Sequence, residues 1–200
     1  QGIFGVGGER HGEILVIADS PKEVVSSVSG DVEGKILIGG AQVTRSALDD
    51  AARRGAVGMV AGGIMDSDLG EFVGHEIGVA ITGDEDVPLT LILTEGFGPI
   101  HMAERTFKLL KSLEGKFAAI NGATQIRAGA MRPEIIVPMT SDQEEDSSPR
   151  LEDDNILAVG TVIRAVRQPH FGRVGSVVEL PPEPVRVPSG AIVRVLKMKF

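Results

Sequence analysis

Short apolar runs, each bounded by glycine or polar residues, recur through the first part of the chain. Most positions in them are Ile, Leu, Val or Ala, whereas a strand with one solvated face would alternate apolar and polar residues. The pattern therefore predicts strands that are buried on both faces. Four runs have this pattern: Glu13–Ala18, Lys35–Ile38, Val57–Ala61 and Leu89–Thr94. Lys116–Ile120 and Ile135–Val137 are two further strand candidates.

Helical periodicity occupies three of the segments between these runs. Thr44–Arg54 places its apolar residues on one face, its first residue is a suitable N-cap, and Gly55 is a suitable stop. Asp66–Val73 predicts a shorter helix, and His101–Leu113 predicts a longer one.

Strand, glycine turn and helix follow one another three times. The glycines are Gly39 and Gly40, then Gly62 and Gly63, then Gly96 and Gly98. Alternating strands and helices favour parallel strands joined by right-handed crossovers. We therefore expect an α/β fold, a glycine-rich layer of largely parallel strands and helices.

The C-terminal part has a different pattern, with very short apolar runs broken by Gly and Pro. Leu196, Met198 and Phe200 alternate with Lys197 and Lys199, which predicts a half-buried strand with its basic residues outward. Several such strands in so short a segment predict a small β-barrel.

One segment of this part, residues 160–180, resembles the KOW motif of transcription elongation factors and several ribosomal proteins. An apolar strand leads into a turn with an aromatic residue and a glycine, and a Gly-x-Val pattern follows. The resemblance implies an SH3-like barrel that binds RNA, RNA polymerase or ribosomal components. Gln168 and Pro169 depart from it, since many members have a glycine there. The matching positions are Phe171, Gly172, Gly175 and Val177 to Leu180.

An acidic segment separates the two parts. Residues 141–155 contain seven acids, one Arg and no apolar periodicity, which is typical of a flexible linker. We therefore expect an α/β domain at 1–140 and the KOW-like barrel at 156–200. The chain enters an apolar stretch directly after Gln1 and Gly2, and we expect a preceding segment to be missing.

Composition excludes several kinds of chemistry. The chain has no Cys, so disulfides, thiol nucleophiles and zinc–thiolate sites are excluded. We expect no cofactor and no metal, because His11, His75 and His101 do not have the spacing of a helical metal site. No apolar run is long enough to span a membrane, and we expect a cytoplasmic protein.

Charge is distributed unevenly along the chain. Residues 157–200 carry seven bases and two acids, a net charge of +5, so the rest carries −13 of the total of −8. A basic module on an acidic chain indicates an anionic partner such as RNA. A solvated barrel surface is the alternative. The candidate nucleic-acid-binding residues are Arg164, Arg167, Arg173, Lys197 and Lys199.

The three glycine turns are the candidate ligand site of the first domain. At one edge of a parallel sheet, their N–H groups and the following helix N-termini would suit a phosphate or carboxylate. Thr44 and Ser67 would add hydroxyl groups. Glycines that only permit tight turns and close packing remain the alternative, since no P-loop lysine is present.

Titratable residues offer weaker candidates for catalysis. Glu95 lies in a glycine turn and His101 begins a predicted helix, so the two could form an acid–base pair. Arg127 and Arg132 could clamp an anion, or Arg132 could pair with Glu134.

Two functions follow from these patterns. The first is a non-enzymatic binding protein whose KOW-like barrel contacts nucleic acid or the transcription or translation machinery, with the α/β domain as an adaptor or ligand sensor. The second is an enzyme that binds an anionic small molecule at the glycine turns.

Overall fold

The computed structural model describes residues 1–74, 86–124, 131–138, 157–165, 170, 173–187 and 189–200. The chain divides into two compact units, Gln1–Thr140 and Ser141–Phe200. The linker predicted at residues 141–155 lies outside the described residues.

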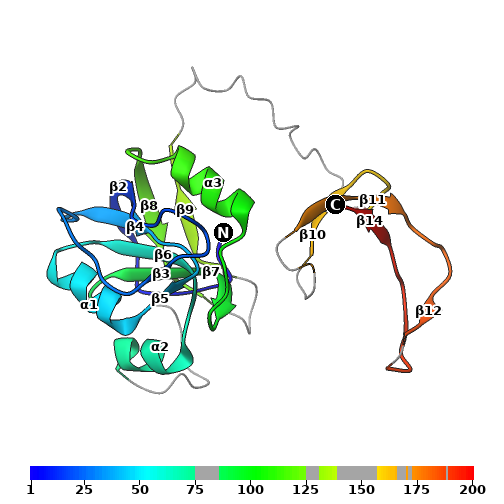
Figure 1. Ribbon diagram of the computed structural model, residues 1–200, viewed down its shortest axis with the longest axis horizontal. Helices are drawn as coiled ribbons and strands as arrows, with labels where there is room; N and C mark the ends of the chain where they lie inside the picture. The colour runs from blue at the N-terminus through cyan, green and yellow to red at the C-terminus, as the bar shows by residue number, and fades with distance from the viewer. Residues whose placement is uncertain (75–85, 125–130, 139–156, 166–169, 171–172, 188) are drawn as a thin grey trace. The chain divides into compact units, whose positions relative to one another are not determined.

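A single mixed sheet dominates the described part of the first unit (Figure 1). Its main path has the order β1-β7-β6-β4-β2-β8-β9, and β3 and β5 pair beside it. The strands are β1 (Phe4–Val6), β2 (Arg10–Val16), β3 (Val24–Val25), β4 (Lys35–Ile38), β5 (Gln42–Val43), β6 (Gly58–Ile64), β7 (Thr90–Phe97), β8 (Phe117–Asn121) and β9 (Glu134–Ile136).

The centre of this sheet is parallel and its two sides are antiparallel. β2, β4, β6 and β7 run in one direction. β1 pairs antiparallel with β7 at one side, while β8 and β9 form an antiparallel pair at the other. Antiparallel pairing therefore extends a parallel core in both directions.

Both ends of the sheet curl until they meet. The Gly2 N–H donates to the Pro133 carbonyl at 2.8 Å, and the Gly122 N–H donates to the Gly7 carbonyl at 3.0 Å. Buried Thr124 accepts from the Gly5 N–H at 2.9 Å through Oγ1. These bonds join the β1 side to the segment around β8 and β9, so the sheet encloses its own interior.

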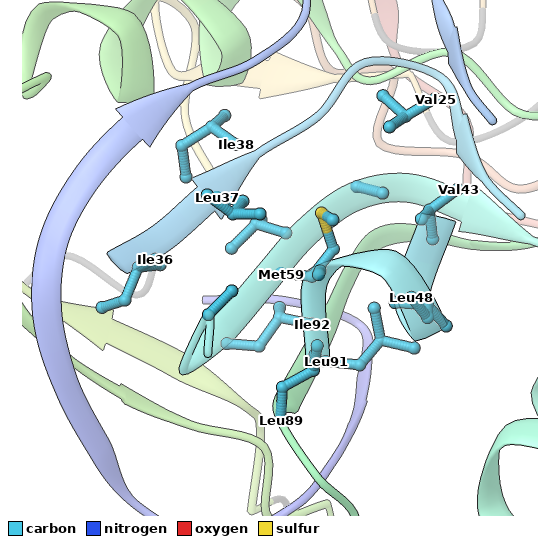
Figure 2. Close-up of a cluster of buried hydrophobic side chains, with 14 of the residues drawn as sticks. Val25, Ile36, Leu37, Ile38, Val43, Leu48, Met59, Leu89, Leu91 and Ile92 are labelled. Carbon is cyan, nitrogen blue, oxygen red and sulfur yellow. The ribbon is translucent and has the colours of Figure 1, made fainter. Parts of the chain in front are cut away.

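The sheet is buried on both of its faces over β4, β6 and β7. A Cβ built at Gly58 of β6 would lie 2.9 Å from Ile120 of β8, although β4 and β2 separate these strands in the sheet. This contact crosses the enclosed interior. On the outer face, Figure 2 draws Met59 and Leu91 in one cluster with Leu48 of the first helix.

Three helices occur among the described residues: α1 (Arg45–Arg53), α2 (Asp66–Val73) and α3 (Glu104–Ser112). The Thr44 hydroxyl accepts from the Ala47 N–H, which confirms the predicted N-cap of α1. Gly74 ends α2 in the left-handed conformation. Figure 1 shows α1 beside α2, with α3 apart from both.

The predicted fold class, a helix-rich α/β layer of largely parallel strands, is wrong. Strands make up 37% of the described residues and helices 16%, and the large mixed sheet is curled. The error has a physical cause. A curled sheet with its interior on one face and helices on the other buries both faces, so its strands have the same continuous apolar runs as a layered parallel sheet.

The described strands of the second unit do not close into the expected barrel. β10 (Val162–Arg164), β11 (Val174–Glu179) and β14 (Lys197–Lys199) form an open three-stranded sheet. β12 (Val185–Arg186) and β13 (Ile192–Val193) form a separate pair. Among the described residues of this unit, Val177 alone is buried.

Candidate functional site

The glycines predicted to bind a ligand do converge in the first unit. β4, β6 and β7 are parallel, so their carboxyl ends lie at one edge of the sheet. The register pairs Gly63 with Gln42 of β5 and with Gly96 of β7. Gly62, Gly63 and Gly96 lie within strands, however, and do not form turns.

Most of the backbone N–H groups at this edge are already used. A phosphate or carboxylate needs several free N–H donors that point at one place. Here the donors bond to neighbouring carbonyls at 2.6 to 2.9 Å, which does not favour an anion site. The pairs are Gly39 with Val60, Gly62 with Gly40, Gly63 with Ala41 and Gly98 with Ile64.

Close backbone packing explains why three of these positions are glycine. A Cβ at Gly62 would collide with the Ile100 carbonyl oxygen, and one at Gly63 would collide with the Gly98 carbonyl oxygen. Gly40 is enclosed in the same way by the carbonyls of Ser20 and Glu23. The glycines therefore let neighbouring segments pass each other within the distance that any side chain would block.

The two predicted hydroxyl ligands have different surroundings. The Thr44 hydroxyl accepts from Ala47 and lies 3.4 Å from the Ser26 carbonyl, so it is engaged at the helix start. Ser67 is exposed in the first turn of α2.

Glu95 and His101 lie in contrasting environments. Glu95 is only 6% exposed, and its Oε1 accepts from the Ala103 N–H at 2.9 Å, where α3 begins. The Thr94 hydroxyl lies 3.4 Å from the same oxygen. His101 is exposed. These contacts give Glu95 a capping role at α3, since it satisfies a buried backbone donor that the helix leaves without a partner.

The remaining anion-clamp candidates are not brought together by described contacts. Arg127 lies outside the described residues, and Arg132 is exposed just before β9.

The second unit gathers basic side chains on one face of its sheet. Residues directly opposite each other in an antiparallel pair point to the same side. Arg164 is opposite Val174, Lys199 is opposite Ser176, and Lys197 is opposite Glu179. Val174 and Ser176 share a face because they are two residues apart in β11. We call this surface the basic face and define it by Arg164, Lys197 and Lys199.

Arg173 belongs to the opposite side. Its carbonyl accepts from the Ala165 N–H, so it continues the register one residue before Val174 and faces the other way. Its guanidinium carbon lies 4.2 Å from the centre of the Phe200 ring, and the His170 ring lies 4.7 Å from that ring. Arg173 thus makes a cation–π contact away from the basic face. Arg167 lies outside the described residues.

An acid modifies the basic face. Glu179 Oε2 accepts from Lys197 Nζ at 2.7 Å, and both side chains are more than half exposed. The charge count of this module does not show that Lys197 is paired with an acid. Alternation along β11 could have placed Arg173 on the other side, but Glu179 lies beside Lys197 only because the register shifts between Val177 and Glu179.

No protein-family model matches this chain, and no curated protein or solved structure matches it either. The described residues contain no group of three potential metal-ligating side chains. None of the helices in the described ranges combines the length and the apolar character of a membrane span.

Proposed function

We propose that this chain is a binding protein whose second unit contacts single-stranded RNA through the basic face. The first unit would serve as an adaptor that presents its own surface to another protein. The observation that carries the proposal is the register of β10, β11 and β14, which aligns Arg164, Lys197 and Lys199.

Phosphate contacts fit the chemistry of this surface. Lys and Arg neutralise phosphates without reading sequence, and they account for most non-specific affinity. Exposed Lys199 has neutral Ser176 as its cross-strand neighbour in β11, whereas Lys197 shares its charge with Glu179. We therefore expect weak, salt-sensitive binding in which Lys199 contributes more than Lys197.

Titration of a labelled RNA oligonucleotide with the full chain tests this proposal. Affinity should fall with salt, with a log–log slope of roughly −2 if about three phosphates are contacted. Lys199→Gln and Arg164→Gln should each weaken binding at low salt and reduce the steepness of the salt dependence by roughly 0.7.

Two further variants sharpen the test. Glu179→Gln should strengthen binding by about two- to fivefold, because it releases Lys197 from an exposed ion pair. Arg173→Gln removes the same charge as Arg164→Gln but on the other side of the sheet, so it is the matched control. Equal losses for Arg164→Gln and Arg173→Gln would show that net charge, and not the basic face, is responsible.

A further inference from the structure

The outer face of the first unit's sheet is only partly covered. Lys35 and Leu37 lie on this face of β4. Leu37 is opposite Met59 of β6, and Met59 is opposite Leu91 of β7, so these residues lie on the same face. Leu37, Met59 and Leu91 are fully buried, in one cluster with Leu48 of α1 (Figure 2). Over β2, β8 and β9 the same face is exposed or half-buried.

Large apolar side chains lie on this uncovered part. The register places His11, Ala119 and Ile136 in one row across the three strands, and pairs Glu13 with Phe117 in the next row. Phe117 is 62% exposed and Ile136 is 56% exposed. The His11 and Phe117 rings stack with their centres 6.5 Å apart and 9° between their planes. We call this surface the open face and define it by His11, Glu13, Phe117, Ala119 and Ile136.

The opposite side of the same strands is a buried core. Gly12, Ile14, Ala118 and Ile120 alternate with the residues of the open face and are all buried. The exposure of Phe117 and Ile136 is therefore not the result of loose packing in this part of the sheet. A soluble surface seldom keeps such side chains grouped unless another molecule contacts them.

Carboxylates surround the open face. Glu134 shares it through its pairing with Asn121, and Glu9 lies two residues before His11 and contacts His11 Nε2 at 3.2 Å. Glu13 contacts Lys35 at 3.7 Å. Acids thus exceed lysines and arginines among these neighbours, and a second copy of the chain would bring like charges together.

We propose that the open face binds an amphipathic helix of a partner protein, with basic residues along its polar side. A helix is the element that already covers the outer face over β4, β6 and β7, and helix-on-sheet packing would continue that layer. The helix's apolar stripe would contact Phe117 and Ile136, and its Lys or Arg side chains would lie beside Glu13 and Glu134. This contact does not depend on RNA binding by the second unit.

A synthetic peptide provides the test on the full chain. The probe is a fluorescent helix of about five turns, with Leu on one face and Lys on the other. Wild-type protein should bind it, and Phe117→Ser and Ile136→Ser should each weaken binding by about tenfold. Glu134→Gln should weaken binding at low salt and have a smaller effect at high salt.

Leu109→Ser is the matched control, because Leu109 is 59% exposed on α3 and lies outside the open face. It should leave the affinity unchanged. All of these side chains are exposed or partly exposed, so the variants should keep the wild-type melting temperature. The proposal is overturned if the peptide does not bind, or if Leu109→Ser has the same effect as Phe117→Ser. It is also overturned if sedimentation shows a dimer that Phe117→Ser dissociates, since the occupant would then be a second copy.

Discussion

At the scale of single residues, types that commonly bind ligands serve architecture in the first unit. Gly62 and Gly63 allow backbone segments to approach, and their N–H groups bond to carbonyls of neighbouring strands. Glu95, a buried acid next to a glycine, holds the backbone at the start of α3. The residue type therefore predicts a constrained position, while the surrounding atoms decide whether the constraint concerns a ligand or a neighbouring segment.

The glycine at position 63 offers a direct test of this structural role. Gly63→Ala should lower the free energy of unfolding by about 3 kcal/mol or more, because the new Cβ would meet a backbone carbonyl that cannot move independently. Gly8→Ala is the control, since a Cβ at Gly8 meets nothing within 4 Å. Urea unfolding followed by circular dichroism measures both. A stable Gly63→Ala variant would contradict the packing role.

At the scale of elements, alternation along short strands decides what each surface can bind. In β14 the basic residues Lys197 and Lys199 face one way, and Met198 faces the other. In β8 the same alternation separates exposed Phe117 from buried Ala118. Both proposed surfaces depend on such parity, because a shift of one residue would exchange the two faces.

The junction between the ends of the large sheet provides a prediction at this scale. Thr124→Val keeps the side-chain shape but removes the hydroxyl that accepts from the Gly5 N–H and lies 3.1 Å from the Gly5 carbonyl. A buried donor left without a partner should cost about 1–3 kcal/mol of unfolding free energy. Thr124→Ser keeps the hydroxyl and should cost clearly less. Equal melting temperatures for the Val and Ser variants would show that the junction does not stabilise the sheet.

At the scale of the whole molecule, charge is separated along the chain. The 157–200 segment carries +5 within a chain of net charge −8, and the seven acids of residues 141–155 directly precede it in sequence. A polyanion that approaches the basic face therefore meets a field that is repulsive over the rest of the protein. Long-range repulsion of this kind is reduced by salt.

Neutralising those seven acids to Asn and Gln should raise the affinity of the full chain for RNA at low salt. The gain should disappear as the ionic strength approaches physiological values, where the Debye length is about 8 Å. Fluorescence anisotropy over a salt series measures this difference. A gain that persists unchanged at high salt would indicate a local contact in place of long-range repulsion.

Sequence alone located many of the elements. The strand Lys35–Ile38, the helix Asp66–Val73 with its Gly74 stop, and the N-cap Thr44 are all confirmed. These features depend on local preferences, namely apolar runs, glycine conformation and a hydroxyl beside a free N–H, and each is readable within a few residues. The amino-acid pattern also predicted that the three pairs of glycines lie near the carboxyl ends of neighbouring strands, because the ends of parallel strands align.

Only the tertiary structure decided how those elements combine. Antiparallel β1, β8 and β9 curl the sheet closed through contacts such as Gly5 with Thr124, which lie 119 residues apart in sequence. Hydrogen bonds between neighbouring segments use the N–H groups of Gly39, Gly62, Gly63 and Gly98. Phe117, on the outer face of β8, stays exposed. A local pattern carries no information on which distant partner supplies a hydrogen bond. For this reason the chain's apolar runs were consistent with an α/β layer, while pairing across the fold produced a curled, mostly β structure.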